Sequence, residues 1–201
     1  MAGSGFIVSG SGSDQVLIPD THNALDHTSA PLNLLDTTAH GLLSHAGLTG
    51  VGKVLQVVFS LVSDVDTTSV IIPLDDTPPT NTEGKEFMSA TITPSVVSSK
   101  LLIIVKAMVD HDLAGTTVIG ALFKDSEVNA QAVGSVENVP DIGPTGITIF
   151  YVVNSSGLIA ETWKVRCGIS DVGTCTFNGS LTNRLFGTTV KSSIIIAEIG
   201  P

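Results

Sequence analysis

The sequence has few cationic side chains. Nine Lys and Arg residues stand against nineteen Asp and Glu, which gives a formal net charge of −10 and an isoelectric point near 4.6. No Lys or Arg precedes Lys53. A nucleic-acid-binding surface needs clustered cations to displace the phosphate counterions, and anionic membranes repel an acidic surface. We therefore expect neither nucleic acid nor a membrane as a partner.

Long apolar runs are also missing. The longest, Leu101 to Val105, stops at Lys106, whereas a membrane helix needs about 20 residues. The N-terminal Met1–Gly5 lacks the basic start and apolar block of a secretory signal, so we expect synthesis in the cytosol. The mean hydropathy is nevertheless high, +0.40. This combination predicts that some apolar surface is buried between subunits.

Cysteines and large aromatic residues are scarce. Two cysteines are too few for a disulfide scaffold or a structural zinc site, and one Trp and one Tyr give little for an aromatic sugar-binding platform. If Cys167 and Cys175 lie on the two arms of a hairpin around Asp171–Gly173, they face the same side and can form a disulfide. The alternative is two small buried thiols that stay reduced.

Signatures of catalysis are missing too. There is no G-x-S-x-G, and Gly50–Lys53 is too short for a phosphate-binding loop. In the Asp110-His111-Asp112 run, strand alternation points His111 away from both carboxylates, which predicts a solvated loop after a strand. The paired aspartates at 64/66 and 75/76 are typical of turns and lack the ligand count of a calcium loop. We expect no enzyme and no cofactor.

What the chain does contain is abundant Val, Ile and Thr, which favour strands. Apolar and polar residues alternate over 162–169 and 147–153, and Leu55, Val57, Phe59 and Leu61 alternate on one face. The nearly continuous apolar runs 101–109 and 194–199 are typical of central strands covered on both sides. Further candidate strands lie near 67–72, 86–93, 116–123, 128–136 and 174–180, with turn residues between them. The prediction is an all-β fold, a jelly-roll-like antiparallel β-sandwich over residues 53–201.

Residues 1–52 differ in composition. A Gly/Ser-rich start leads into a Leu- and His-rich segment in which the pattern H-x-x-L-x-H occurs twice, at 22–27 and 40–45. We expect an extended attachment arm with at most one helical turn over 31–46. Four histidines at fixed spacing can hold a metal, but H-x4-H does not bring both rings to one helix face, so polar contacts to a neighbouring subunit are the favoured interpretation. The candidate contact residues of the arm are His22, Leu25, His27, Leu34, Leu35, His40, Leu43 and His45.

Three segments resemble a known class of proteins. The run from Ile92 to Val105, ITPSVVSSKLLIIV, resembles the I-T-P-x-x-x-S-S-K-(I/L)-L-(I/V) pattern of tailed-bacteriophage virion proteins. Such chains also end in a segment similar to Ser192–Pro201, and the run 54–58 resembles the usual opening of their domain. The resemblance covers roughly residues 53–201 and points to capsid decoration proteins, head fibres and tail-fibre tips.

The resemblance implies a non-enzymatic homotrimer that is attached to a virion through its N-terminal arm. Apolar strand faces left over from the sandwich core would then be buried around the three-fold axis. Because the chain is short and has no long shaft, we expect a capsid decoration or head-fibre protein bound to the major capsid protein on the capsid surface. The alternative is a tail-fibre or receptor-binding tip that contacts tail or baseplate proteins and a host-surface glycan.

Overall fold

The computed structural model describes residues 6–9, 16–19, 52–137 and 143–201. The chain divides into two units, Met1–Val51 and Gly52–Pro201. In the first unit, β1 (Phe6–Ser9) and β2 (Val16–Pro19) pair antiparallel, with Phe6 opposite Pro19. The helical turn expected within 31–46 lies outside the described residues.

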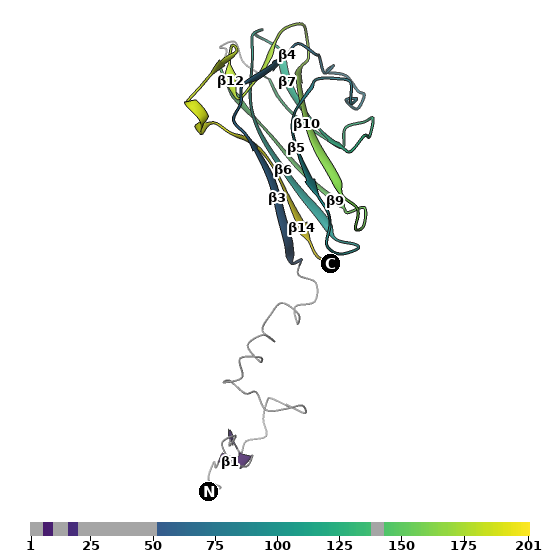
Figure 1. Cartoon of the computed structure of the whole chain (residues 1–201), viewed down its shortest axis with the longest axis vertical. Helices are drawn as coiled ribbons and strands as arrows, with labels where there is room; N and C mark the ends of the chain where they lie inside the picture. Colours follow the sequence, from purple (N-terminus) through teal and green to yellow (C-terminus); the bar gives the residue numbers. More distant parts are fainter. Residues whose placement is uncertain (1–5, 10–15, 20–51, 138–142) are drawn as a thin grey trace. The chain divides into compact units, whose positions relative to one another are not determined.

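The second unit is an all-β sandwich of two antiparallel sheets (Figure 1). The first sheet contains β3 (Val54–Val62), β14 (Ser192–Ile199), β6 (Lys100–His111) and β9 (Thr145–Asn154), in that order. Beyond the end of β14, the last residues of β6 pair with β11 (Cys175–Phe177), which in turn pairs with β4 (Asp66–Thr68). The second sheet contains β5 (Lys85–Ile92), β10 (Glu161–Ile169), β7 (Thr117–Lys124) and β8 (Ala132–Glu137). A short ribbon, β12 (Gly179–Ser180) with β13 (Asn183–Arg184), and a 3-10 turn, η4 (Gly187–Thr189), precede β14.

The strand pairing identifies the topology. β3 pairs with β14, β5 with β10, β6 with β9 and β7 with β8, so that the outermost strands of the sequence pair first and the innermost last. An antiparallel ribbon of such nested pairs, rolled so that alternate pairs enter alternate sheets, is a jelly roll. The predicted fold class is therefore confirmed.

The core lies between the sheets and follows the predicted alternation. Trp163, Val165, Cys167 and Ile169 of β10 all point inward and are fully buried, opposite the inward residues of β6, β9 and β14. Phe87 of β5 and Phe177 of β11 stack across the core with ring centroids 4.7 Å apart. Side chains that alternate on a strand can pack in this way because successive Cβ atoms point to opposite faces.

The outside of the second sheet is covered by the chain itself. Ile72, from the covering segment 69–84, packs there against Ile119, Ala121 and Phe123 of β7 in a second buried cluster, and the loop 125–131 lies beside it. Gly84 and Gly168 allow this close approach: a Cβ on Gly84, whose φ is +60°, would lie 2.7 Å from the Cys167 carbonyl oxygen, and one on Gly168 would lie 2.6 Å from that of Val70. The strand expected over 67–72 consequently ends at Thr68, where the chain leaves the first sheet.

The hairpin around Asp171–Gly173 that a disulfide would require does not form. Cys167 lies on β10 of the second sheet and Cys175 on β11 of the first, so the loop between them crosses from one sheet to the other. Both thiols are free and buried. The structure thus agrees with the alternative of two small buried thiols.

Candidate interaction surface

The candidate contact residues of the arm lie outside the described residues. They are His22, Leu25, His27, Leu34, Leu35, His40, Leu43 and His45. Among the residues that the structure does describe, no three His, Cys, Asp or Glu side chains are grouped closely enough to hold a metal ion.

The Asp110-His111-Asp112 run differs from its prediction in one respect. As expected, the carboxylates and the imidazole have separate partners: Asp110 accepts a hydrogen bond from Ser180 Oγ, Asp112 accepts one from Thr174 N at 2.6 Å, and His111 Nδ1 lies 3.2 Å from Thr116 Oγ1. The expected solvated loop is wrong, however, because β6 continues to His111, and Asp110 and His111 are 0% and 1% exposed. The β12–β13 ribbon lies against this end of β6 and supplies the Ser180 hydroxyl.

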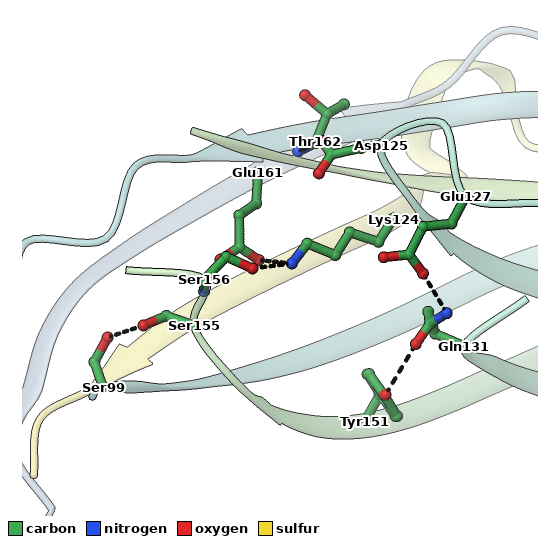
Figure 2. A network of polar contacts seen from close by, with 10 residues as sticks. All are labelled: Ser99, Lys124, Asp125, Glu127, Gln131, Tyr151, Ser155, Ser156, Glu161 and Thr162. Carbon is green, nitrogen blue, oxygen red and sulfur yellow. Dashed lines mark hydrogen bonds and ion pairs between the residues drawn. The ribbon is translucent and has the colours of Figure 1, made fainter. Parts of the chain in front are cut away.

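A Ser–Lys pair, which the sequence analysis missed, lies at the opposite end of β7 (Figure 2). Lys124 Nζ donates a hydrogen bond to Ser156 Oγ and lies 3.2 Å from Glu161 Oε2, and Ser156 N donates to Glu161 Oε1. Catalytic Ser–Lys pairs use the lysine as a base. Here the ammonium is paired with a carboxylate that is 1% exposed, so it acts as a donor that fastens the β9–β10 loop to the sandwich.

A second polar junction joins the three segments that resemble virion proteins. Glu198 of β14 is fully buried, and its carboxylate accepts hydrogen bonds from Ser95 N at 2.9 Å, Ser95 Oγ at 2.8 Å, Val96 N at 3.2 Å and Gln56 Nε2 at 2.7 Å. Burial by itself raises the pKa of Glu198, but the hydrogen bonds from Gln56 and Ser95 outweigh it and lower the pKa to about 2. The carboxylate therefore stays ionised and joins the start of β3, the β5–β6 loop and the end of β14.

The largest unusual feature is on the outside of the first sheet. One row of paired residues crosses four strands and reads Phe59, Ile195, Ile104, Phe150. The next row reads Val57, Ala197, Leu102, Val152. We call these eight residues together with Leu61 the outer apolar face.

The members of the outer apolar face on the two outside strands are widely exposed. Phe59 is 64% and Phe150 69% exposed, and Val57, Leu61 and Val152 are each more than half exposed. The members on β6 and β14 are half-buried. The sequence predicted that the strands at 101–109 and 194–199 are covered on both sides. Within one chain, only their inward side chains are covered, by the second sheet. The sequence did carry a signal for this face, because both the odd- and the even-numbered residues of these strands are apolar. A strand with one face in water alternates between apolar and polar residues instead.

Two hollows on the second sheet's side are the other candidate sites. One, of about 230 Å³, lies beside Phe123, Lys164 and Arg166. Its cations are already used, because Arg166 donates to the carbonyl oxygens of Glu83 and Gly84 and Lys164 pairs with Glu86. The other, of about 370 Å³, lies under the proline-rich segment 73–79. Neither hollow has an apolar lining that crosses four strands, as the outer apolar face does.

Comparisons with known proteins find solved structures of similar fold at low sequence identity. No protein-family model matches the sequence, and no curated protein matches it. Among the solved structures it is similar to the Eiger TNF of S. frugiperda (TM-score 0.43, 10% identity, 72% of this chain and 93% of that one). It is also similar to latent PorU of Porphyromonas gingivalis (0.39, 10%, 76% and 14%) and to infectious bursal disease virus strain Gx (0.32, 9%, 73% and 38%). Likeness at this level carries no argument about function.

None of the described residues belongs to a helix that could span a lipid bilayer.

Proposed function

We propose that this protein is a structural component of a tailed-bacteriophage virion, a capsid decoration or head-fibre protein. Its N-terminal segment, residues 1–52, binds the major capsid protein of the assembled capsid, and residues 53–201 project from it as a trimeric sandwich. In this role the chain performs no catalysis and needs no cofactor.

The Glu198 junction is the observation that carries the proposal. The sequence resemblance rests on three separate segments, 54–58, 92–105 and 192–201. Gln56, Ser95 and Glu198 each come from a different one of these segments, and all three meet through hydrogen bonds of 2.7–3.0 Å. Because the structure brings all three segments to one junction, they form parts of a single domain, which supports the resemblance more than three scattered short matches would.

The use of the buried polar groups agrees with a structural role. Lys124 and Glu161 hold the β9–β10 loop, Asn178 joins β3 to β14, and Glu198 holds the β5–β6 loop. Each of these groups is occupied in fastening one part of the sandwich to another. A protein that binds only the assembled shell stabilises that form by mass action, and a rigid, well-fastened domain suits the purpose.

Deletion tests the proposed attachment. Protein lacking residues 1–50 is mixed with particles from which the native protein is missing, and the bound fraction is measured by co-sedimentation. We expect the truncated protein to stay folded and to bind no particles. If it still decorates them, the attachment site lies on the sandwich and the proposal is wrong in that part.

Point substitutions refine the same test in the full-length chain. Replacement of Leu25, Leu34, Leu35 and Leu43 by Ala should weaken particle binding at least tenfold, because the arm offers these apolar side chains to its site on the capsid. The matched control is Leu74→Ala, which removes a leucine that is 68% exposed on the sandwich. If both variants lost the same amount of particle binding, the proposal that the arm binds the capsid would be wrong.

A further inference from the structure

The outer apolar face has a shape and a chemistry that fit one particular partner. We propose that it is the contact surface between copies of this chain, and that three copies enclose it around a three-fold axis. This inference deepens the proposed function, since it rests on the trimer stated there and identifies the surface that makes it.

The outer apolar face is a contiguous apolar surface on the outside of the sandwich. Four strands about 4.8 Å apart make a sheet about 19 Å wide, and the two apolar rows extend about 14 Å along the strands. The two rows cover roughly 270 Å² in plan, with Phe59 and Phe150 mostly exposed at the two edges. Contiguous exposed apolar patches of a few hundred Å² are often contact sites for another molecule. The same chain does cover the corresponding outer face of its second sheet, where Ile119 and Phe123 are buried.

The width of the sheet fits three copies. Three faces of about 19 Å, set as the sides of a triangular prism with strands along the axis, place each sheet about 5.5 Å from that axis. This is about half of the 10 Å that separates packed sheets, so the outward side chains of three sheets fill the interior without leaving a channel. Ile104 and Ile195, in the middle of the row, then point at the axis.

The order of residues in the rows fits a closed ring. Phe59 lies on one edge strand and Phe150 on the other, so the β3 edge of one copy meets the β9 edge of the next, phenylalanine against phenylalanine. The next row has Val57 and Val152 at the same two edges. A ring in which each copy uses one edge towards each neighbour needs two apolar edges, and this sheet has both.

The charges point to the same partner. Each copy carries a formal charge of −10, so copies repel unless they meet where acidic groups are absent. Within the described strands, the outward side chains of β3, β9, β14 and β6 as far as Met108 include no carboxylate. Their charged members are Lys100 and Lys106, one beyond each end of the apolar rows. Long lysine side chains there can lie along the apolar surface and place their ammonium groups in water.

The outer apolar face can form the apolar centre of an interface between copies. A standard interface uses about 800 Å² from each partner, with an apolar centre and a polar rim. The two rows of the outer apolar face supply about a third of this as the centre, and the flanking polar rows supply a rim.

The test measures the mass of the purified full-length chain by sedimentation equilibrium at about 10 μM. We expect three times the chain mass of 20.7 kDa. The single variants Phe59→Glu and Phe150→Glu should each sediment as a monomer and keep the far-ultraviolet circular dichroism of the parent. Leu74→Glu, which changes a 68% exposed leucine above the second sheet, is the matched control and should remain a trimer. A monomeric or dimeric parent, or a trimer that survives both phenylalanine substitutions, overturns the proposal.

A cross-linking variant keeps the test decisive if the charged variants fail to fold. In the double variant Phe59→Cys with Phe150→Cys, oxidation should join neighbouring copies and give a band at three chains on a non-reducing gel, whereas neither single variant should exceed two chains. Cys167 and Cys175 are buried and should not contribute. A double variant that stays at one chain overturns the ring.

These measurements use no virions, so their outcome is separate from that of the particle-binding test. A trimer that binds no particle contradicts the proposed function and leaves the interface standing. A monomer that binds particles contradicts the interface alone.

Discussion

The Glu198 carboxylate accepts two hydrogen bonds from Ser95, one from the backbone N–H at 2.9 Å and one from the hydroxyl at 2.8 Å, although 103 residues separate the two in sequence. Ser95 lies in the loop between β5 and β6, and Glu198 is the penultimate residue of β14, the last strand. A buried carboxylate is stable only when its oxygens are well supplied with donors. The pair therefore closes one end of the sandwich.

Neutralising this carboxylate should destabilise the domain. Glu198→Gln keeps the size of the side chain but weakens the four charge-assisted hydrogen bonds from Gln56, Ser95 and Val96, and it places an amide N–H₂ against backbone donors. We expect a loss of about 2–4 kcal/mol in the free energy of unfolding, measured by urea denaturation. Glu137→Gln, at an exposed position of β8, is the matched control and should change the value by less than about 0.5 kcal/mol. Equal stability of the two variants would show that the junction is not structural.

The same carboxylate predicts how stability depends on pH. The pKa of Glu198 is lowered from its ordinary value of 4.5 to about 2 in the folded protein. A group whose pKa is depressed by folding contributes its full stabilisation above the unfolded pKa and loses it as pH falls through the folded pKa. The difference in unfolding free energy between the parent and Glu198→Gln should thus be constant above pH 5 and shrink between about pH 4.5 and 2. A difference that stays unchanged down to pH 2 would contradict the assignment.

Asn178 should be as important for the other end of the sheet. Its side-chain amide donates to the carbonyl oxygens of Val62 at 2.8 Å and Asp64 at 3.2 Å and accepts from Ser192 Oγ at 2.7 Å, and its own φ is 56°. Asn178→Ala removes these bonds and puts a less tolerant residue in a left-handed conformation, so we expect a loss of about 2–4 kcal/mol by thermal or urea unfolding. Asn183→Ala, at an exposed position of β13, serves as the control. If Asn178→Gly restored full stability, the backbone conformation and not the side-chain bonds would explain the effect.

The two thiols should be inert in the native protein. Burial raises the pKa of Cys175 to about 12 and that of Cys167 in the same direction, and both are 0% exposed. Because the thiolate is the reactive form, Ellman's reagent at pH 8 should label neither cysteine until denaturant is added, and then both. Rapid labelling of the native protein would mean that the region between β10 and β11 opens readily.

Much of the sandwich follows from alternation in the sequence. The inward sets on β9 and β10, such as Ile147 and Ile149 or Trp163 and Val165, are predicted correctly because burial on one side and polar residues on the other leave a period of two. The strand at 67–72 was predicted too long, since Val70 to Ile72 are apolar for a different reason: they cross over β10 and cover its outside.

The candidate surface was harder to predict. On β3 the residues Val57, Phe59 and Leu61 alternate as a core-facing set does, yet it is Val58 and Val62 that pack on the core. When both parities of a strand are apolar, periodicity does not say which side faces the core and which faces a second molecule. Pairings such as Ser95 with Glu198 or Lys124 with Glu161 join distant segments, and no pattern of neighbouring residues in the sequence predicts them.

The central claim is that the chain is part of a virion head, and immunoelectron microscopy of the phage particles that carry it tests this most directly. An antibody against the sandwich should label the capsid over its whole surface, and removal of residues 1–50 should abolish that label. Label confined to the tail tip would contradict the capsid assignment and transfer the role to host recognition, and particles without any label would contradict a virion function altogether.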